Sequence, residues 1–185
     1  MASLKNEEIR ETFYYLSTLE NVLNKEIHSV DGNKSNLNKI VPENIQNLHS
    51  DKKEKANSFM LSLSKIQYES SVITLLASFK KVVFSKYKTS YGEIKSLVGS
   101  QTKNTIAFYK AREKFVNSKK NENLSSIIDL IEGHVNDTLI KSLKMIKEQR
   151  DYIAHGKRFG TEPVQNLSLA RIAETLDEIV SEIEK

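Results

Sequence analysis

Apolar residues recur every three or four positions along most of this chain, which is the spacing of helices that bury one face. The first run covers residues 3–28, and Ser3 is its expected N-cap. Residues 30–51 break the pattern, because a turn signal of Asp, Gly and Asn is followed by Pro42. We expect a long loop there, with one short helix at 42–48.

A second long run of apolar positions follows this loop. Asp51 or Asn57 could open it, and it continues to about residue 87. Between residues 72 and 84 the apolar positions cover more than one face of the expected helix. A helix that is apolar on several sides is surrounded by protein, so this run predicts the central and most buried helix.

Shorter helical runs are expected in the middle of the chain. Ser90 and Glu93 have the spacing of a capping box, and Gly99 fits the end of a short helix. A further run covers 102–117, and the run at 124–131 is short and apolar. The pattern therefore predicts separate short helices between the central helix and the C-terminal third.

Two more helices are predicted in the C-terminal third. The first is capped by Asn136 or Asp137 and ends at Gly156, a residue suited to the left-handed position after a helix. The second starts at Asn166 or Ser168 and is amphipathic. Because the chain has only 6 Gly and 2 Pro, we expect an all-α, up-and-down bundle of about five to seven helices.

Length and composition favour one soluble globular domain spanning residues 1–185. There is no cysteine, which excludes a disulfide framework, a thiolate zinc site and a cysteine nucleophile. The first residues lead into charged positions, and the most apolar stretch, 72–79, is far too short to span a bilayer. We therefore expect a cytoplasmic protein with no membrane contact.

Charge is distributed unevenly along the chain, whose net charge is +4. Between residues 80 and 120, eleven basic residues face two acidic ones; between 161 and 185, six acidic residues face two basic ones. A basic middle segment suits a polyanionic partner such as RNA. Solvated helix faces are the alternative, and the aromatic residues among these lysines could either stack bases or belong to the core.

The richest chemistry lies where the penultimate predicted helix ends. Arg150 is followed by Asp151, and His155 by Gly156. This arrangement resembles the Arg-x4-His motif of HEPN domains, which are small α-helical domains that include many RNases. The resemblance implies a HEPN-like fold and an endoribonuclease whose site contains the arginine, the aspartate and the histidine.

The spacing of these residues suggests how each would act. Asp151 and His155 are four residues apart, so they share one helix face within hydrogen-bond reach. A carboxylate there would orient the imidazole and favour its protonated form. His155 could serve as general acid and base on the RNA 2′-OH and the leaving 5′-oxygen, while Arg150 stabilises the phosphorane. This chemistry requires no metal and no other cofactor, so we expect none.

RNA is the expected partner of this site. The residues expected to hold its phosphates lie on the basic middle segment and around the motif: Lys110, Arg112, Lys114, Lys147, Lys157 and Arg158. The resemblance implies a homodimer whose two motifs face one cleft, and it suggests a toxin or phage-defence effector with an antitoxin or regulatory protein. HEPN toxins paired with a nucleotidyltransferase antitoxin carry a tyrosine two places after the histidine. This chain has Lys157 there, so adenylylation of that position is not expected.

Other interpretations of the same residues stay open. A non-catalytic HEPN-like module that binds RNA or a protein partner could carry the same helices, with Arg150 and His155 as ordinary surface residues. His134 and Asp137 are three apart and could share a metal, but the sequence offers no third ligand, so no metal site is expected. Three carboxylates of the last helix are expected on a solvated face: Glu174, Asp177 and Glu178.

Overall fold

A computed structural model of the chain describes residues 4–32, 52–98, 123–155 and 167–184. These residues form five helices: α1 (Glu7–Gly32), α4 (Lys52–Val98), α6 (Leu124–Ile131), α7 (Asp137–Ala154) and α8 (Leu169–Ile183). The described residues contain no strand, only an isolated bridge between Glu132 and Val135 in the turn before α7. The predicted all-α class is confirmed for this part of the chain.

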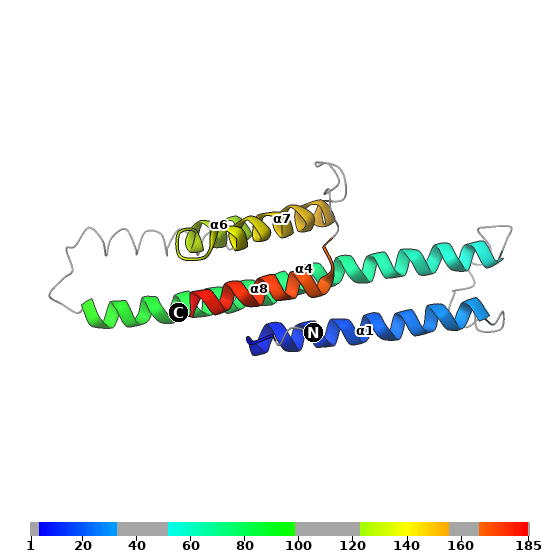
Figure 1. Cartoon of the computed structure of the whole chain (residues 1–185), viewed down its shortest axis with the longest axis horizontal. Helices are drawn as coiled ribbons and strands as arrows, with labels where there is room; N and C mark the ends of the chain where they lie inside the picture. Colours follow the sequence, from blue (N-terminus) through cyan, green and yellow to red (C-terminus); the bar gives the residue numbers. More distant parts are fainter. Residues whose placement is uncertain (1–3, 33–51, 99–122, 156–166, 185) are drawn as a thin grey trace.

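The long helix α4 is the axis of the protein. In Figure 1 it runs along the length of the molecule, with α1 on one side, α7 on the other, and α8 over its middle. α4 contacts each of the other four described helices, and the long helices alternate in direction. The described helices thus form an up-and-down bundle.

The core gathers the apolar faces of α1, α4, α7 and α8 around the middle of α4. That middle part contributes Leu75 and Phe79, which are fully buried, and α7 contributes Leu143 and Ile146. Burying a side chain of this size stabilises the fold by roughly 1.5–3 kcal/mol, so these contacts are the main source of stability. The run at 72–84 lies in the helix that contacts all the other described helices, as predicted. The prediction that it is also the most buried helix is wrong, because α8 buries eight of its 15 residues, whereas Ile73 of α4 is 40% exposed.

Several helix boundaries in the C-terminal part agree with the sequence prediction. α6 coincides with the short run at 124–131. Asn136 caps α7 and Ser168 caps α8, each through a side-chain oxygen that accepts a hydrogen bond from a backbone N–H of the first turn. The helices predicted at 42–48 and 102–117 lie outside the described residues.

α4 is longer than predicted. It continues to Val98 instead of ending near residue 87, so the prediction of a separate short helix capped by Ser90 is wrong. A Ser–Glu pair caps a helix only where the chain before the serine leaves the helical conformation. The single glycine after Ser90 within α4, Gly92, weakens a helix by only about 1 kcal/mol. Although α4 has 47 residues, neither it nor any other described helix is apolar enough over a sufficient length to cross a membrane.

α1 differs from the prediction at its described ends. It begins at Glu7, where Asn6 Oδ1 accepts a hydrogen bond of 3.2 Å from the backbone N–H of Ile9. The predicted cap, Ser3, lies outside the described residues. At its other end α1 continues to Gly32, so the expected turn signal does not stop the helix at residue 28. 

Asp177 of α8 is buried, which corrects the prediction of a solvated face at this position. Its Oδ2 accepts a hydrogen bond of 2.9 Å from the backbone N–H of Lys5, and its Oδ1 accepts one of 2.6 Å from that of Asn6. The free N–H groups at a helix start need acceptors and attract negative charge. Asp177 therefore ties the beginning of α1 to α8.

Candidate active site at the end of α7

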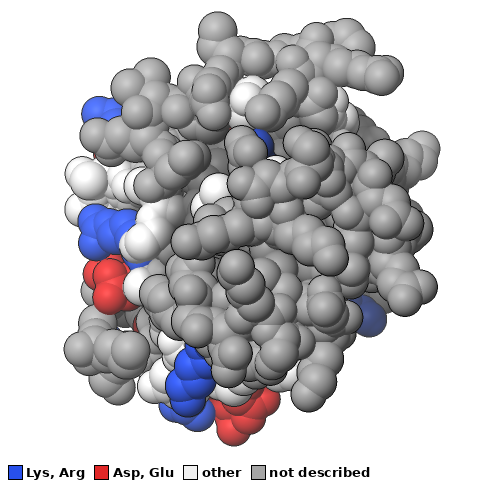
Figure 2. Space-filling model, turned by 90° about the vertical axis from the view of Figure 1, so that its right-hand side faces the viewer, with Lys and Arg blue, Asp and Glu red and all other residues white. Residues whose placement is uncertain are grey.

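The predicted motif lies at the C-terminal end of α7, beside the start of α8 (Figure 1). α7 ends at Ala154, and His155 follows as its C-cap with φ −97° and ψ 4°. The side chain of Arg150 is 41% exposed, and His155 is exposed. Figure 2 views the molecule from the side toward which α7 runs, and its described surface shows basic and acidic side chains next to each other. Both motif side chains are accessible from solvent, as contact with an RNA phosphate requires.

Asp151 is held by two cations. Its Oδ2 accepts a hydrogen bond of 2.6 Å from Lys147 Nζ, and its Oδ1 accepts one of 2.9 Å from Arg150 Nη1. Partial burial acts to raise the pKa of Asp151, but the hydrogen bonds from Lys147 and Arg150 outweigh it, so the pKa lies below its usual range. Because the folded-state pKa is lowered, these ion pairs stabilise the fold above the usual carboxyl range and are lost as pH falls through the lowered value.

The hydrogen bond expected between Asp151 and His155 is not present. The two residues are linked only through the backbone, where His155 N–H donates to the Asp151 carbonyl at 3.0 Å. Within the described structure no residue forms a hydrogen bond or ion pair with the imidazole. Lys147, one turn before Asp151, and Arg150, its neighbour, already engage both carboxylate oxygens. The aspartate therefore positions the two cations and, among the described residues, leaves the imidazole without a partner.

Two residues beside the motif are not among those that the sequence predicts. Gln149, directly before Arg150, is only 2% exposed, and its Nε2 donates a hydrogen bond of 2.5 Å to Tyr68 Oη on α4. The signal that could have found it is a polar residue three positions after the buried Ile146, where the apolar face of α7 continues. Its partner could not be found in this way, because no sequence pattern pairs position 149 with position 68.

One of the six predicted RNA-binding residues lies within the described part of the chain. Five of them lie outside the described residues: Lys110, Arg112, Lys114, Lys157 and Arg158. The sixth, Lys147, lies on α7 next to Arg150, where its ammonium group contacts Asp151. Its ammonium group is thus close to the motif and engaged by a carboxylate, and RNA binding by Lys147 stays a prediction.

The described beginning of the basic segment forms a small hollow on α4. This hollow has a volume of about 480 Å³, and its described lining includes Lys80, Lys88 and the half-buried Phe84. Within the described part of the chain neither of these lysines has an ion-pair partner, whereas Lys81 pairs with Glu8 on α1. A pair of unneutralised lysines beside an aromatic ring suits a nucleic-acid backbone.

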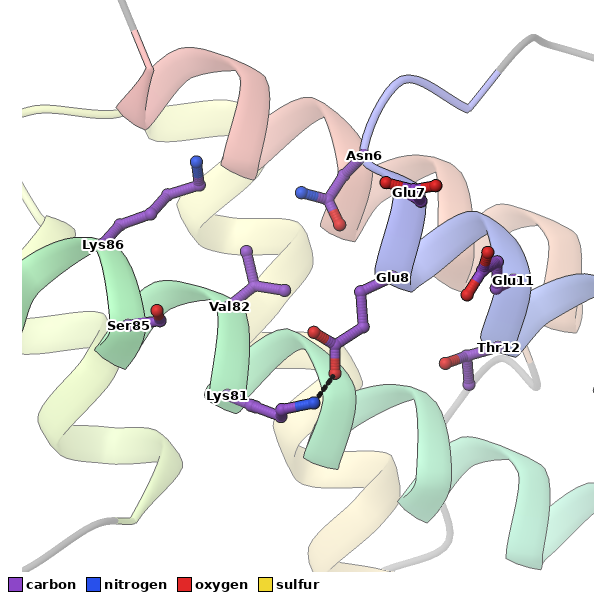
Figure 3. Close-up of a pocket in the computed structure, with 9 residues that line it drawn as sticks. All are labelled: Asn6, Glu7, Glu8, Glu11, Thr12, Lys81, Val82, Ser85 and Lys86. Carbon is purple, nitrogen blue, oxygen red and sulfur yellow. Dashed lines mark hydrogen bonds and ion pairs between the residues drawn. The ribbon is translucent and has the colours of Figure 1, made fainter.

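A hollow of about 700 Å³ lies between the first turns of α1 and the middle of α4. Figure 3 shows Glu8 of α1 reaching Lys81 of α4 across it, with Glu8 Oε1 accepting a hydrogen bond of 2.8 Å from Lys81 Nζ. Its described lining contains no histidine and no residue of α7. Without an imidazole, this lining offers no side chain of the type that exchanges protons near neutral pH, so the hollow suits acid–base chemistry less well than the end of α7.

Neither the possible metal ligands of the described residues nor a comparison with known proteins points to another kind of site. In the described ranges no three His, Asp or Glu residues gather in a way that could hold a metal ion. His134 and Asp137 are both exposed at the start of α7. The chain matches no protein-family model, no curated protein and no solved structure. Fold and site together define an all-α bundle that presents an arginine and a histidine at one helix end.

Proposed function

We propose that this protein is a metal-independent endoribonuclease of the HEPN type. The observation that carries the proposal is the end of α7, where an exposed imidazole and a partly exposed guanidinium are both accessible in an all-α bundle. An imidazole can exchange a proton near neutral pH, and a guanidinium stays charged at any physiological pH. These are the two groups that cleavage of RNA by its own 2′-OH needs.

In the proposed reaction, His155 acts as acid and base and Arg150 binds the phosphate. The 2′-OH loses its proton and its oxygen bonds to phosphorus, while the bond from phosphorus to the 5′-oxygen breaks and that oxygen takes up a proton. Arg150 stabilises the negative charge of the phosphorane between these steps. One imidazole cannot stand on both sides of the phosphate, so a homodimer with facing motifs would supply the second group.

The products distinguish this reaction from other nucleolytic routes. We expect fragments with a 2′,3′-cyclic phosphate and a 5′-hydroxyl, because the nucleophile is the neighbouring 2′-oxygen. A labelled RNA, incubated with the full chain and separated before and after phosphatase and kinase treatment, reports both ends. Fragments with a 3′-hydroxyl and a 5′-phosphate would contradict the proposed roles of His155 and Arg150.

Asp151 should oppose RNA binding, because it competes with phosphate for Arg150 and Lys147. We expect Asp151→Asn to tighten RNA binding by about twofold to fivefold, the scale of one exposed ion pair. Asp129→Asn is the matched control, since Asp129 is exposed on α6 and undergoes the same change of charge. Filter binding at low salt measures the effect. Unchanged binding with lost cleavage would instead support the orienting role toward His155 that the sequence predicts.

The lysines of the hollow on α4 should bind RNA phosphates. We expect Lys80→Gln combined with Lys88→Gln to weaken binding and to reduce the salt dependence by about 0.7 in log–log slope per lost phosphate contact. The control is Lys86→Gln combined with Lys144→Gln, which removes the same charge from lysines outside this hollow that are already paired with Glu184 and Glu132. Gel-shift titrations from low to physiological salt measure both slopes. Equal slopes in the two double variants would show that the hollow is an ordinary solvated surface.

A second candidate function is a non-catalytic helical module that binds a protein partner. It is favoured by exposed apolar side chains at helical spacing on α1, namely Tyr15, Leu19 and Val22, whose exposures are 66%, 42% and 54%. The absence of both RNA cleavage and salt-dependent RNA binding in the wild-type chain would favour this module over the enzyme. In either form the protein would act in the cytoplasm, and as a toxin or phage-defence effector it would need an antitoxin or regulatory partner.

A further inference from the structure

A short chain of partly buried hydrogen bonds joins three segments at the residue directly before Arg150. Gln149 of α7 donates from Nε2 to Tyr68 Oη of α4 at 2.5 Å, and Tyr68 Oη donates to the backbone carbonyl of Leu167. Leu167 directly precedes Ser168, the N-cap of α8. The end of α7, the first half of α4 and the start of α8 are therefore connected through one phenol oxygen.

The phenol hydroxyl of Tyr68 can donate one hydrogen bond and accept another at neutral pH. Burial raises its pKa, the hydrogen bond from Gln149 lowers it, and the charge of Glu20 raises it, with a net increase. A raised phenol pKa keeps the proton on the oxygen over the whole physiological range. The oxygen therefore accepts from the amide and donates to the carbonyl at the same time, which fixes the direction of both bonds.

Packing alone does not account for an amide at position 149. Gln149 Oε1 is buried and has no hydrogen-bond partner among the described residues, and an unmet buried acceptor is unfavourable by about 1–3 kcal/mol. A methionine of similar length would fill the same space with no such penalty. A buried polar pair that packing does not require is best explained by the orientation that it imposes.

The rotation of the last turn of α7 decides where the motif residues lie. Arg150 follows Gln149 immediately, and His155 lies six residues after Gln149, past the last helical residue. The neighbouring core contacts of α7, such as Ile146, are apolar and tolerate small rotations of the helix. The hydrogen bond to Tyr68 does not tolerate such rotations, because its distance and angle are kept only at one rotation of α7 about its axis and one position of α7 along α4.

We propose that Tyr68 and Gln149 are positioning residues for the candidate active site: their hydrogen bond sets the rotation of the end of α7 and thereby the places of Arg150 and His155. The catalytic part of this inference rests on the proposed RNase function. The structural part, the immobilisation of the last turn of α7, can be measured without any activity.

The test compares Tyr68→Phe and Gln149→Met with Asp177→Asn. The first two remove the link and keep the size of the side chain. Asp177→Asn also disturbs buried hydrogen bonds, but at the junction of α1 and α8. At a temperature where all three are folded, we expect kcat to fall by about tenfold to a hundredfold in the first two variants, the scale of a misplacement near 1 Å. RNA affinity should stay within about twofold, and Asp177→Asn should keep the wild-type kcat once stability is matched.

Hydrogen exchange gives the readout that does not depend on activity. Amides of residues 150–155 should exchange faster in Tyr68→Phe and Gln149→Met but not in Asp177→Asn. The double variant should be no worse than Tyr68→Phe alone, since that substitution already removes both hydrogen bonds of the phenol. If the wild type does not cleave RNA, the proposed function fails and the exchange data alone decide the positioning. The positioning role would be contradicted if hydrogen exchange of residues 150–155 were unchanged in Tyr68→Phe and Gln149→Met. It would also be contradicted if an active enzyme kept its kcat in these variants, or if Asp177→Asn lost as much kcat or protection as they do.

Discussion

Alanine at His155 or at Arg150 is expected to abolish RNA cleavage and leave a folded protein. Loss of a general acid–base group lowers the rate by about 10²–10⁴-fold, and loss of a donor to developing charge by about 10²–10³-fold. Neither change should unfold the chain, because the imidazole has no described side-chain partner and the guanidinium is 41% exposed. Its ion pair with Asp151 is near the surface, where such pairs are worth about 1 kcal/mol or less.

Matched controls exist for both substitutions. His134→Ala removes an exposed imidazole in the turn before α7, and Arg171→Ala removes a guanidinium that is 62% exposed on α8. Both control variants should cleave RNA at the wild-type rate. Initial rates with a labelled RNA, together with circular dichroism melts, measure activity and folding separately. Full RNA-cleavage activity in a folded His155→Ala or Arg150→Ala variant would contradict the proposed catalytic role of that residue.

Asp177→Asn is expected to destabilise the fold by about 2–3 kcal/mol, because a buried carboxylate accepts two backbone hydrogen bonds there and a carboxamide can replace only one. In a chain of this length that corresponds to a fall in Tm of about 4–12 °C. Urea denaturation measures the free energy of unfolding. Glu178→Gln is the control, since the neighbouring Glu178 is exposed and loses the same charge. Equal stability of the two variants would show that the link between α8 and α1 contributes little.

The sequence predicts the helical class and the place of the motif, because both depend on local patterns. Apolar spacing alone locates α6 and the buried centre of α4, and short polar residues mark the caps of α7 and α8. The length of α4 is missed because a capping signal at Ser90 says nothing about whether the preceding chain is already helical. Local signals identify where helices can begin, and packing along the bundle decides where they do.

The contacts of the site residues are predicted less well than their positions. Spacing permits Asp151 to reach His155, Arg150 or Lys147, and the sequence does not decide between them. In the structure the two cations hold the carboxylate. The hydrogen bond between Tyr68 and Gln149 joins residues 81 positions apart, and no periodic pattern connects positions at that separation.

One measurement tests the central proposal most directly: cleavage of a labelled RNA by the full wild-type chain in excess EDTA, followed over time beside the Arg150→Ala variant. If a histidine and an arginine perform the reaction, the wild type cleaves at the same rate in EDTA as in Mg²⁺, and the variant does not cleave in either. Cleavage that stops in EDTA and returns with added Mg²⁺, or that persists equally in the variant, would contradict an RNase site at the end of α7.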